Sequence, residues 1–128
     1  PCEAIVYGRL PLMITENCIV ANEFGCRHFK GRCGALCADS ACAGAPELTD
    51  RVGERFPVLH AYGCRSELQN GKTLWLADKY RKIGLTYARL RFTTESAEEC
   101  VRVLRAYRGR EEYTPKDITR GLFYRGVE

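Results

Sequence analysis

Cysteine is the residue type that offers the most chemistry in this sequence. The chain has eight cysteines among 128 residues. Five lie in or at the mouth of the predicted loop 16–46: Cys18, Cys26, Cys33, Cys37 and Cys42. Residues 26–42, which contain four of them, have almost nothing that could form a core. A sixth, Cys64, follows in the sequence YGCRS. Four thiolates around one zinc ion make a tetrahedral site that can organise such a loop, and zinc is redox-inert.

The cysteine spacings leave three kinds of site open. Cys33, Cys37 and Cys42 form C-x3-C and C-x4-C pairs, which are looser than the C-x2-C pairs of common zinc ribbons. The same ligands can hold an iron–sulfur cluster, and in an oxidising compartment they would form disulfides. Cys2 and Cys100 stand apart. Cys100 falls on the apolar stripe of a predicted helix, where a thiol usually behaves as a small buried hydrophobe.

Other polar residues are weaker candidates, and none is assigned a catalytic role. His28 and His60 lie in the cysteine region, but neither sits in a recognisable nucleophile motif. Arg89 and Arg91 share one face of a predicted strand and could bind an anion such as phosphate, although a solvated face would look the same. Four further residues could position a substrate or a metal ion: Glu16, Asn17, Asp50 and Arg51. For Asp50 and Arg51, a turn and an ion pair are at least as good an explanation. Tyr7 and Arg9 are weaker candidates.

Length and composition fit one domain with a hydrophobic core, because 45% of the 128 residues are apolar. The 20 basic and 16 acidic residues make a mixed surface, unlike the basic stripe of a dedicated nucleic-acid binder. The sequence contains neither a membrane-spanning apolar run nor a signal peptide, so we expect a soluble, cytoplasmic protein. Because the chain begins at Pro1 rather than Met, we expect a piece of a longer polypeptide.

Hydrophobic patterns predict the order of the elements. Residues 4–15 predict a strand covered on both faces, and 47–63 predict a β-hairpin around Gly53. A turn at Asn70-Gly71 should precede a short strand at 72–78, then a short helix at 78–83 and an alternating strand at 85–92. Ser96 and Glu99 form a capping box before helix 97–107. The predicted apolar stripe of this helix is Ala97, Cys100, Val101, Leu104 and Tyr107.

This order is typical of an α/β fold with a βαβ-like unit near its end. We expect an α/β domain over residues 1–108, with the cysteine-rich loop at 16–46 and the hairpin as an insertion. Residues 109–128 form a polar C-terminal tail with a few aromatic side chains.

Five ordered segments together resemble the C-terminal part of the collagenase-like peptidases, family thirty-two of the peptidases of unassigned catalytic type. The resemblance covers nearly the whole chain and is strongest in the first two segments and the last. The segments are YGRLPLMITENC (7–18), LTDRVGERFPV (48–58), LQNGKTLWLADK (68–79), LRFTTE (90–95) and TRGLFYRGVE (119–128).

The resemblance implies a fragment of a barrel-like parallel α/β body from a bacterial protein with a proteolytic, hydrolase activity. Other members resemble hydroxylation factors that modify RNA bases, in rRNA or tRNA, and carry a four-cysteine iron–sulfur cluster. The family's cysteine-bearing signature in the N-terminal barrel half is absent here. We therefore expect this piece not to catalyse a reaction alone, and its partners to be the N-terminal part of its parent chain and a peptide or RNA substrate.

The resemblance also implies which cysteines bind the metal. Cys18 and Cys64 match the outer two positions of the family's cysteine pattern. Cys26 and Cys42 match the inner two, and an insertion between them holds Cys33 and Cys37, either of which could replace an inner ligand. The expected function is thus a C-terminal domain with a structural zinc site. An iron–sulfur RNA-hydroxylation factor and a non-catalytic binding module are the alternatives.

Overall fold

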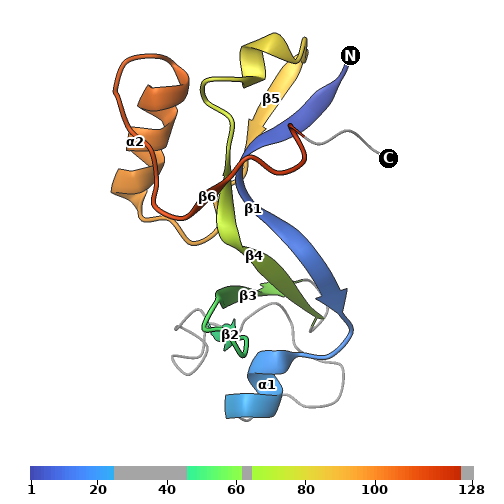
Figure 1. The fold of residues 1–128 in the computed structure, drawn as a ribbon. Helices are drawn as coiled ribbons and strands as arrows, with labels where there is room; N and C mark the ends of the chain where they lie inside the picture. Colours follow the sequence, from blue (N-terminus) through green and yellow to red (C-terminus); the bar gives the residue numbers. More distant parts are fainter. Residues whose placement is uncertain (25–45, 62–64, 125–128) are drawn as a thin grey trace. The chain divides into compact units, whose positions relative to one another are not determined.

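The computed structural model describes residues 1–24, 46–61 and 65–124 (Figure 1). The strands are β1 (Glu3–Thr15), β2 (Glu47–Thr49), β3 (Arg55–Ala61), β4 (Arg65–Trp75), β5 (Tyr87–Leu90) and β6 (Ile118–Thr119). The helices are α1 (Ile19–Phe24) and α2 (Ala97–Tyr107), with a 3-10 turn, η2 (Tyr80–Lys82), between β4 and β5. The strands form one sheet in the order β2-β3-β4-β1-β5, and β6 pairs with β4.

The sheet is mixed, so the predicted parallel α/β barrel-like body is wrong. β1 pairs with β5 and β4 with β6 in parallel, whereas β2, β3 and β4 pair antiparallel. In a parallel barrel a helix would follow nearly every strand. Here β2, β3 and β4 succeed one another without a helix, and α2 is the one described helix longer than two turns. No helix in the described ranges is long and apolar enough to cross a membrane. The fold is mostly β.

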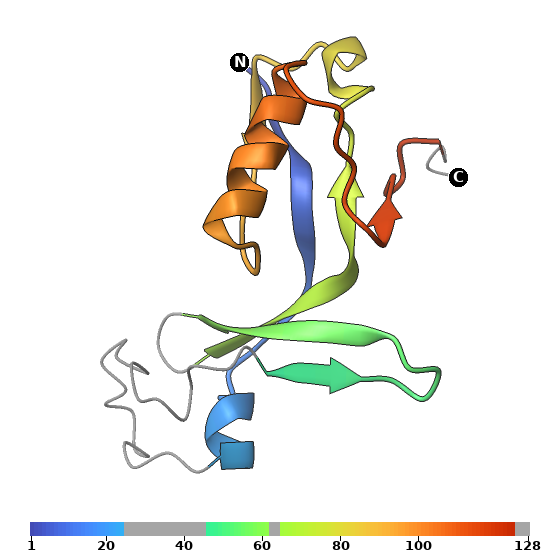
Figure 2. The same ribbon diagram turned by 90° about the vertical axis from the view of Figure 1, so that its left-hand side faces the viewer.

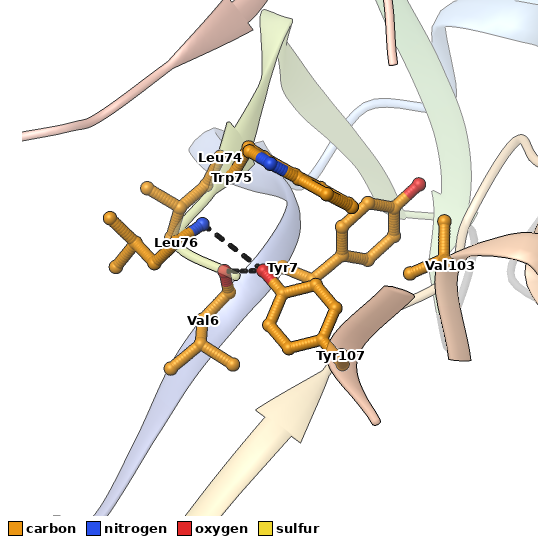
Figure 3. Close-up of a cluster of buried hydrophobic side chains, with 7 residues drawn as sticks. All are labelled: Val6, Tyr7, Leu74, Trp75, Leu76, Val103 and Tyr107. Atoms are coloured by element: carbon orange, nitrogen blue, oxygen red, sulfur yellow. Dashed lines mark hydrogen bonds between the residues drawn. The ribbon is translucent and has the colours of Figure 1, made fainter. Parts of the chain in front are cut away.

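The chain divides into two compact units, and the first comprises residues 1–10 and 72–128. In this unit α2 packs on the sheet (Figure 2). The core side chains come from β1, α2 and the end of β4: Val6, Tyr7, Leu74, Trp75, Leu76, Val103 and Tyr107 (Figure 3). Trp75 meets Tyr7 and Tyr107 edge to face, with ring centroids 5.8 and 5.1 Å apart. Burial of these rings supplies the main force that holds α2 on the sheet.

The Tyr107 hydroxyl joins β1 to Leu76, the residue that follows β4. It donates a hydrogen bond to the carbonyl oxygen of Val6 at 2.6 Å and accepts one from the Leu76 N–H at 3.1 Å (Figure 3). Burial raises the pKa of Tyr107 well above its usual value, so the phenol stays neutral and keeps donating. The Leu76 N–H also donates to the Val6 carbonyl oxygen at 3.2 Å, so the hydroxyl adds a second hydrogen bond to each of these two buried backbone groups.

Tyr107→Phe should lower the free energy of unfolding by about 1 kcal/mol, because it keeps the ring but removes two buried hydrogen bonds, while the Val6 carbonyl oxygen and the Leu76 N–H stay paired with each other. Denaturant titration followed by fluorescence of Trp75, the single tryptophan, measures the change. Tyr113→Phe is the matched control. Its ring also packs on Trp75, at 6.1 Å, and no described residue hydrogen-bonds its hydroxyl. Equal losses for both variants would contradict the role given to the Tyr107 hydroxyl.

Helix α2 begins at the predicted capping box, which is confirmed. The Glu99 N–H donates to Ser96 Oγ at 3.2 Å, and the Ser96 N–H donates to Glu99 Oε2 at 2.8 Å. The predicted apolar stripe is partly wrong. Val103 and Tyr107 are the buried residues of α2, whereas Val101 and Leu104 are 45% and 41% exposed. Helical spacing locates an apolar face only to within a rotation, and the aromatic core decides which part of it is covered.

Ser96→Ala should lower the free energy of unfolding by about 1 kcal/mol, because the N-terminal turn of α2 loses its side-chain acceptor.

The hydrogen bonds from Ser96 lower the pKa of Glu99 below its ordinary value of 4.5. The stabilisation from the Glu99 carboxylate is therefore complete above pH 4.5 and is lost as the pH falls through the lowered pKa. Unfolding titrations of wild type and Glu99→Gln from neutral to acid pH should converge at the acid end. A constant difference between them would contradict this contribution.

The second unit, residues 11–71, contains the predicted hairpin. Leu48 pairs with Phe56 and Thr49 with Arg55 in antiparallel register. Asp50 Oδ1 closes the turn by accepting the N–H groups of Val52 and Glu54 at 2.8 and 2.9 Å. Figure 2 shows β2 and β3 side by side. The hairpin prediction is confirmed, and an Asx-type turn explains why Asp stands at this position.

The predicted turn at Asn70-Gly71 is wrong, because β4 runs unbroken from Arg65 to Trp75. Gly71 serves a close approach instead. A Cβ at this position would lie 2.5 Å from Glu54 Oε1 and 2.8 Å from the carbonyl oxygen of Arg55. Glycine stands at this position because neighbouring backbone approaches too closely for a Cβ. The local sequence does not distinguish this cause from a hairpin turn.

The prediction that β1 is covered on both faces holds only for its first half. Val6, Tyr7 and Gly8 are buried, whereas residues 11–14 of the same strand are exposed. The apolar run therefore continues beyond the part of the strand that packs against a core.

Candidate functional site

Cys18 is the predicted metal ligand that the structure describes. It lies between β1 and α1, is half-buried, and starts the helix by accepting the Asn22 N–H on its carbonyl oxygen at 3.2 Å. Its sulfur accepts a hydrogen bond from the Ala21 N–H at 3.3 Å. The Ala21 N–H therefore orients the sulfur that the prediction assigns to the metal.

Two contacts join the residues around Cys18 to the start of β4. Arg65 Nε donates to Glu16 Oε1 at 2.9 Å, and the Ile19 N–H donates to Ser66 Oγ at 2.9 Å. The exposed ion pair contributes little by itself. The Ser66 bond matters more, because Ser66 is fully buried and satisfies a backbone donor at the start of α1. These contacts span 49 and 47 residues of sequence.

The other predicted ligands lie outside the described residues. These are Cys26, Cys42 and Cys64, together with the alternatives Cys33 and Cys37, so the four-cysteine set stays a prediction. Within residues 1–24, 46–61 and 65–124, no three His, Cys, Asp or Glu side chains gather as a metal site would require. Of the cysteines predicted to be non-ligands, Cys2 is exposed and Cys100 is half-buried on α2.

The remaining polar candidates have structural roles where they are described. Asp50 closes the hairpin turn, and Arg51 is exposed. Arg89 pairs with Glu3 at 2.6 Å, and Arg91 donates to the carbonyl oxygen of Arg9 at 3.0 Å. The two arginines thus contact different partners, and the anion site stays a prediction. His60 is half-buried, and His28 lies outside the described residues. The Asn17 N–H donates to Thr15 Oγ1.

Sequence reasoning missed a polar site around Glu95 in the first unit. Glu95 Oε1 accepts the Tyr7 hydroxyl at 3.0 Å, while Oε2 accepts the N–H groups of Thr93 and Thr94 at 2.6 and 3.1 Å. Burial, together with the nearby Glu95 carboxylate, raises the pKa of Tyr7 far above its usual value, so this phenol donates and does not ionise. The only sequence signal is TTES before α2, which resembles an ordinary helix start. The side chains of Tyr7 and Glu95 both line a pocket of about 500 Å³.

A second pocket, of about 620 Å³, also lies in the first unit. Its charged lining residues are Asp78, Glu111, Glu112 and Arg120. Arg120 donates to the Trp75 carbonyl oxygen at 2.8 Å and to the Asp78 carboxylate. Burial opposes ionisation of Asp78, but the hydrogen bonds and charges of Arg120 and Lys79 and a backbone hydrogen bond together outweigh it and lower the pKa of that carboxyl. Arg120 therefore connects the C-terminal segment to the end of β4, and its guanidinium is already hydrogen-bonded within the protein.

Comparisons with protein-family models, with curated protein sequences and with solved structures found no match to this chain. The resemblance to the collagenase-like peptidases therefore rests on the five sequence segments alone.

Proposed function

We propose that this chain is the C-terminal domain of a collagenase-like peptidase-family protein of the cytoplasm. Cys18, Cys26, Cys42 and Cys64 then hold a structural metal ion, zinc. The domain contributes no catalytic residue of its own. Its partners are the N-terminal part of the parent chain and the peptide or RNA on which the whole protein acts. The five ordered segments support the family, and the surroundings of Cys18 support the metal site.

The contacts between the Cys18 region and the start of β4 are the observation that carries the metal proposal. Glu16 and Ile19 flank Cys18 in the sequence, and they contact Arg65 and Ser66, the two residues that directly follow Cys64. Two predicted ligands that are 46 positions apart in the numbering are therefore attached to backbone segments in direct contact. A metal site needs such convergence of ligands that are distant in the sequence, so these contacts support the proposal.

The chemistry of the donors fits a zinc ion. Thiolates bind zinc at about 2.3 Å in tetrahedral geometry, and a closed four-thiolate site stabilises a fold without taking part in a reaction. The Ala21 N–H that donates to Cys18 Sγ is an outer contact of the kind that tunes thiolate ligands. The apolar residues of segment 16–46 are mostly alanine and cysteine, with few large side chains that could form a core, so metal binding would contribute much of the free energy that orders it.

Ser66→Ala should weaken metal binding by roughly tenfold, because an outer contact that orients a ligand segment is lost. The Ile19 N–H would lose its acceptor while the thiols remain. Competition with a chromogenic chelator measures the affinity. Thr86→Ala is a control, because its hydroxyl accepts the Cys2 N–H in the other unit. Unchanged affinity in Ser66→Ala would remove the main structural support for the site.

An iron–sulfur cluster is the second candidate, since it uses the same four thiolates and the resembling hydroxylation factors carry one. N–H donation to a cluster sulfur ligand, as Ala21 makes to Cys18, is also one of the contacts that set cluster potentials. In that case the parent protein modifies RNA.

Elemental analysis and absorption spectroscopy of protein purified without added zinc separate the possibilities. A colourless protein with one zinc per chain supports the structural zinc site. A brown protein that absorbs near roughly 400 nm supports the cluster. Protein with neither metal, all of whose thiols react with a thiol reagent, overturns both and leaves a non-catalytic binding module. Assays of the full-length parent on gelatin-like peptides and on RNA then decide between protease and hydroxylase.

A further inference from the structure

The pocket beside Glu95 has charges of both signs in equal number. Its volume is about 500 Å³, within the range of small-molecule sites. The walls come from β1, β4, the first turns of α2 and segment 113–117 of the first unit. Its charged lining residues are Glu95, Glu99, Asp117, Arg9, Arg102 and Lys116. A wall with equal numbers of carboxylates and cations has no net charge, and it complements a ligand that carries both signs better than a ligand that carries one.

Three of these charges are fixed by contacts within the protein. Glu95 accepts three hydrogen bonds, and Glu99 accepts the Ser96 N–H at 2.8 Å. Arg102 pairs with Glu111 at 3.1 Å, and its guanidinium lies 4.2 Å from the ring centroid of Tyr113. These groups form a rigid polar wall, because each is oriented before any ligand arrives.

Lys116 and Asp117 are arranged differently. Both are exposed, adjacent in the chain and opposite in charge, and among the described residues neither side chain has an ion pair or hydrogen bond. The backbone that carries them is nevertheless fixed. The carbonyl oxygen of Asp117 accepts the Thr73 N–H at 3.0 Å, and the next residue, Ile118, pairs with Thr73 in the sheet. One cation and one carboxylate therefore stand side by side on a rigid base at the pocket.

Asp117 has a left-handed backbone conformation, with φ of 52°. Among the residues that the structure describes, no other non-glycine residue has a positive φ. Glycine would adopt this conformation without strain, whereas aspartate adopts it at some cost. The position thus keeps a carboxylate where the backbone alone would favour glycine.

We propose that this pocket binds a zwitterion of amino-acid size, such as a free α-amino acid. The ammonium group of the ligand donates to the Asp117 carboxylate, and its carboxylate group contacts the Lys116 ammonium. The hydroxyls of Thr94 and Thr114, which also line the pocket, bind polar side-chain atoms. The proposal goes beyond the metal function and uses none of the cysteines.

Isothermal titration calorimetry on the full chain tests the proposal with L-serine, L-glutamate, L-lysine and L-alanyl-L-alanine as probes. We expect at least one probe to bind with a dissociation constant below about 1 mM. Its N-acetyl derivative, which lacks the cation, and its C-terminal amide, which lacks the anion, should each bind at least about tenfold more weakly. The proposal is overturned if no probe binds at concentrations up to about 10 mM, or if either derivative binds as tightly as the parent zwitterion.

Matched variants locate the binding. Asp117→Asn keeps a residue that tolerates a left-handed backbone but removes the charge, and Lys116→Gln removes the neighbouring cation. Each should weaken binding at least about tenfold, whereas Lys82→Gln on the exposed turn η2 should not change it. Circular dichroism and Trp75 fluorescence establish that each variant is folded. Wild-type affinity in both pocket variants would place the ligand elsewhere and overturn the proposal.

Discussion

Cys18→Ser is expected to abolish stoichiometric metal binding and to lower the free energy of unfolding by about 4 kcal/mol or more. A serine hydroxyl does not replace a thiolate ligand, and the remaining three sulfurs leave the tetrahedral site open. Because the Cys18 region contacts the start of β4 through Ser66, loss of the metal should also loosen that contact. Cys64→Ser should have the same effect. Elemental analysis and thermal unfolding measure both consequences.

Cys100→Ser is the control for these two variants. Cys100 is half-buried on α2, so its replacement should act through packing alone, cost about 1 kcal/mol and leave the metal content unchanged. Treatment of the wild-type protein with a strong chelator should reproduce the Cys18→Ser phenotype. Small and equal effects at Cys18, Cys64 and Cys100 would contradict a shared metal ion.

Gly8→Ala should prevent the first unit from folding, or destabilise it by more than about 4 kcal/mol. Gly8 is buried in β1, where the register with β5 shifts between Ile5 and Tyr7. Its φ of +119° is unfavourable for any L side chain, and a Cβ there would overlap the carbonyl oxygen of Arg91. Backbone cannot move aside as a flexible side chain can. Loss of the emission typical of a buried Trp75, together with loss of the cooperative unfolding transition, would report the effect.

Gly84→Ala is the control that separates the steric clash at Gly8 from the effect of a positive φ alone. Gly84 also has a positive φ, +71°, but no atom lies within 4 Å of the position that a Cβ would occupy. Alanine at this position should therefore cost only about 1–2 kcal/mol, the price of a left-handed residue. If Gly8→Ala were no worse than Gly84→Ala, β1 and residue 91 would not approach as closely as the structure shows.

Elements whose signals lie within a few residues were predictable from the sequence. The Ser96–Glu99 capping box specifies the start of α2, and Asp50 specifies the hairpin turn through its own neighbouring N–H groups. In both cases the hydrogen bonds that make the structure join residues no more than four positions apart. Such contacts depend little on the rest of the fold.

Features that depend on distant partners were not predictable. Asn70-Gly71 suggests a turn until the close approach of Glu54 and Arg55 to Gly71 is known. The Tyr7–Glu95 hydrogen bond spans 88 residues, and nothing local to either residue announces it. The apolar stripe of α2 was misplaced because the buried arc depends on where the rings of the sheet lie.

The sequence by itself therefore determined the hairpin, the capped helix and the concentration of thiols between Cys18 and Cys64. The tertiary structure alone decided that the sheet is mixed, that the start of β4 contacts the Cys18 region, and that opposite charges line one pocket. The physical reason is the range of the interactions. Turns and caps are formed by neighbours in the chain, whereas strand pairing, core packing and pockets are formed by groups that folding alone brings together.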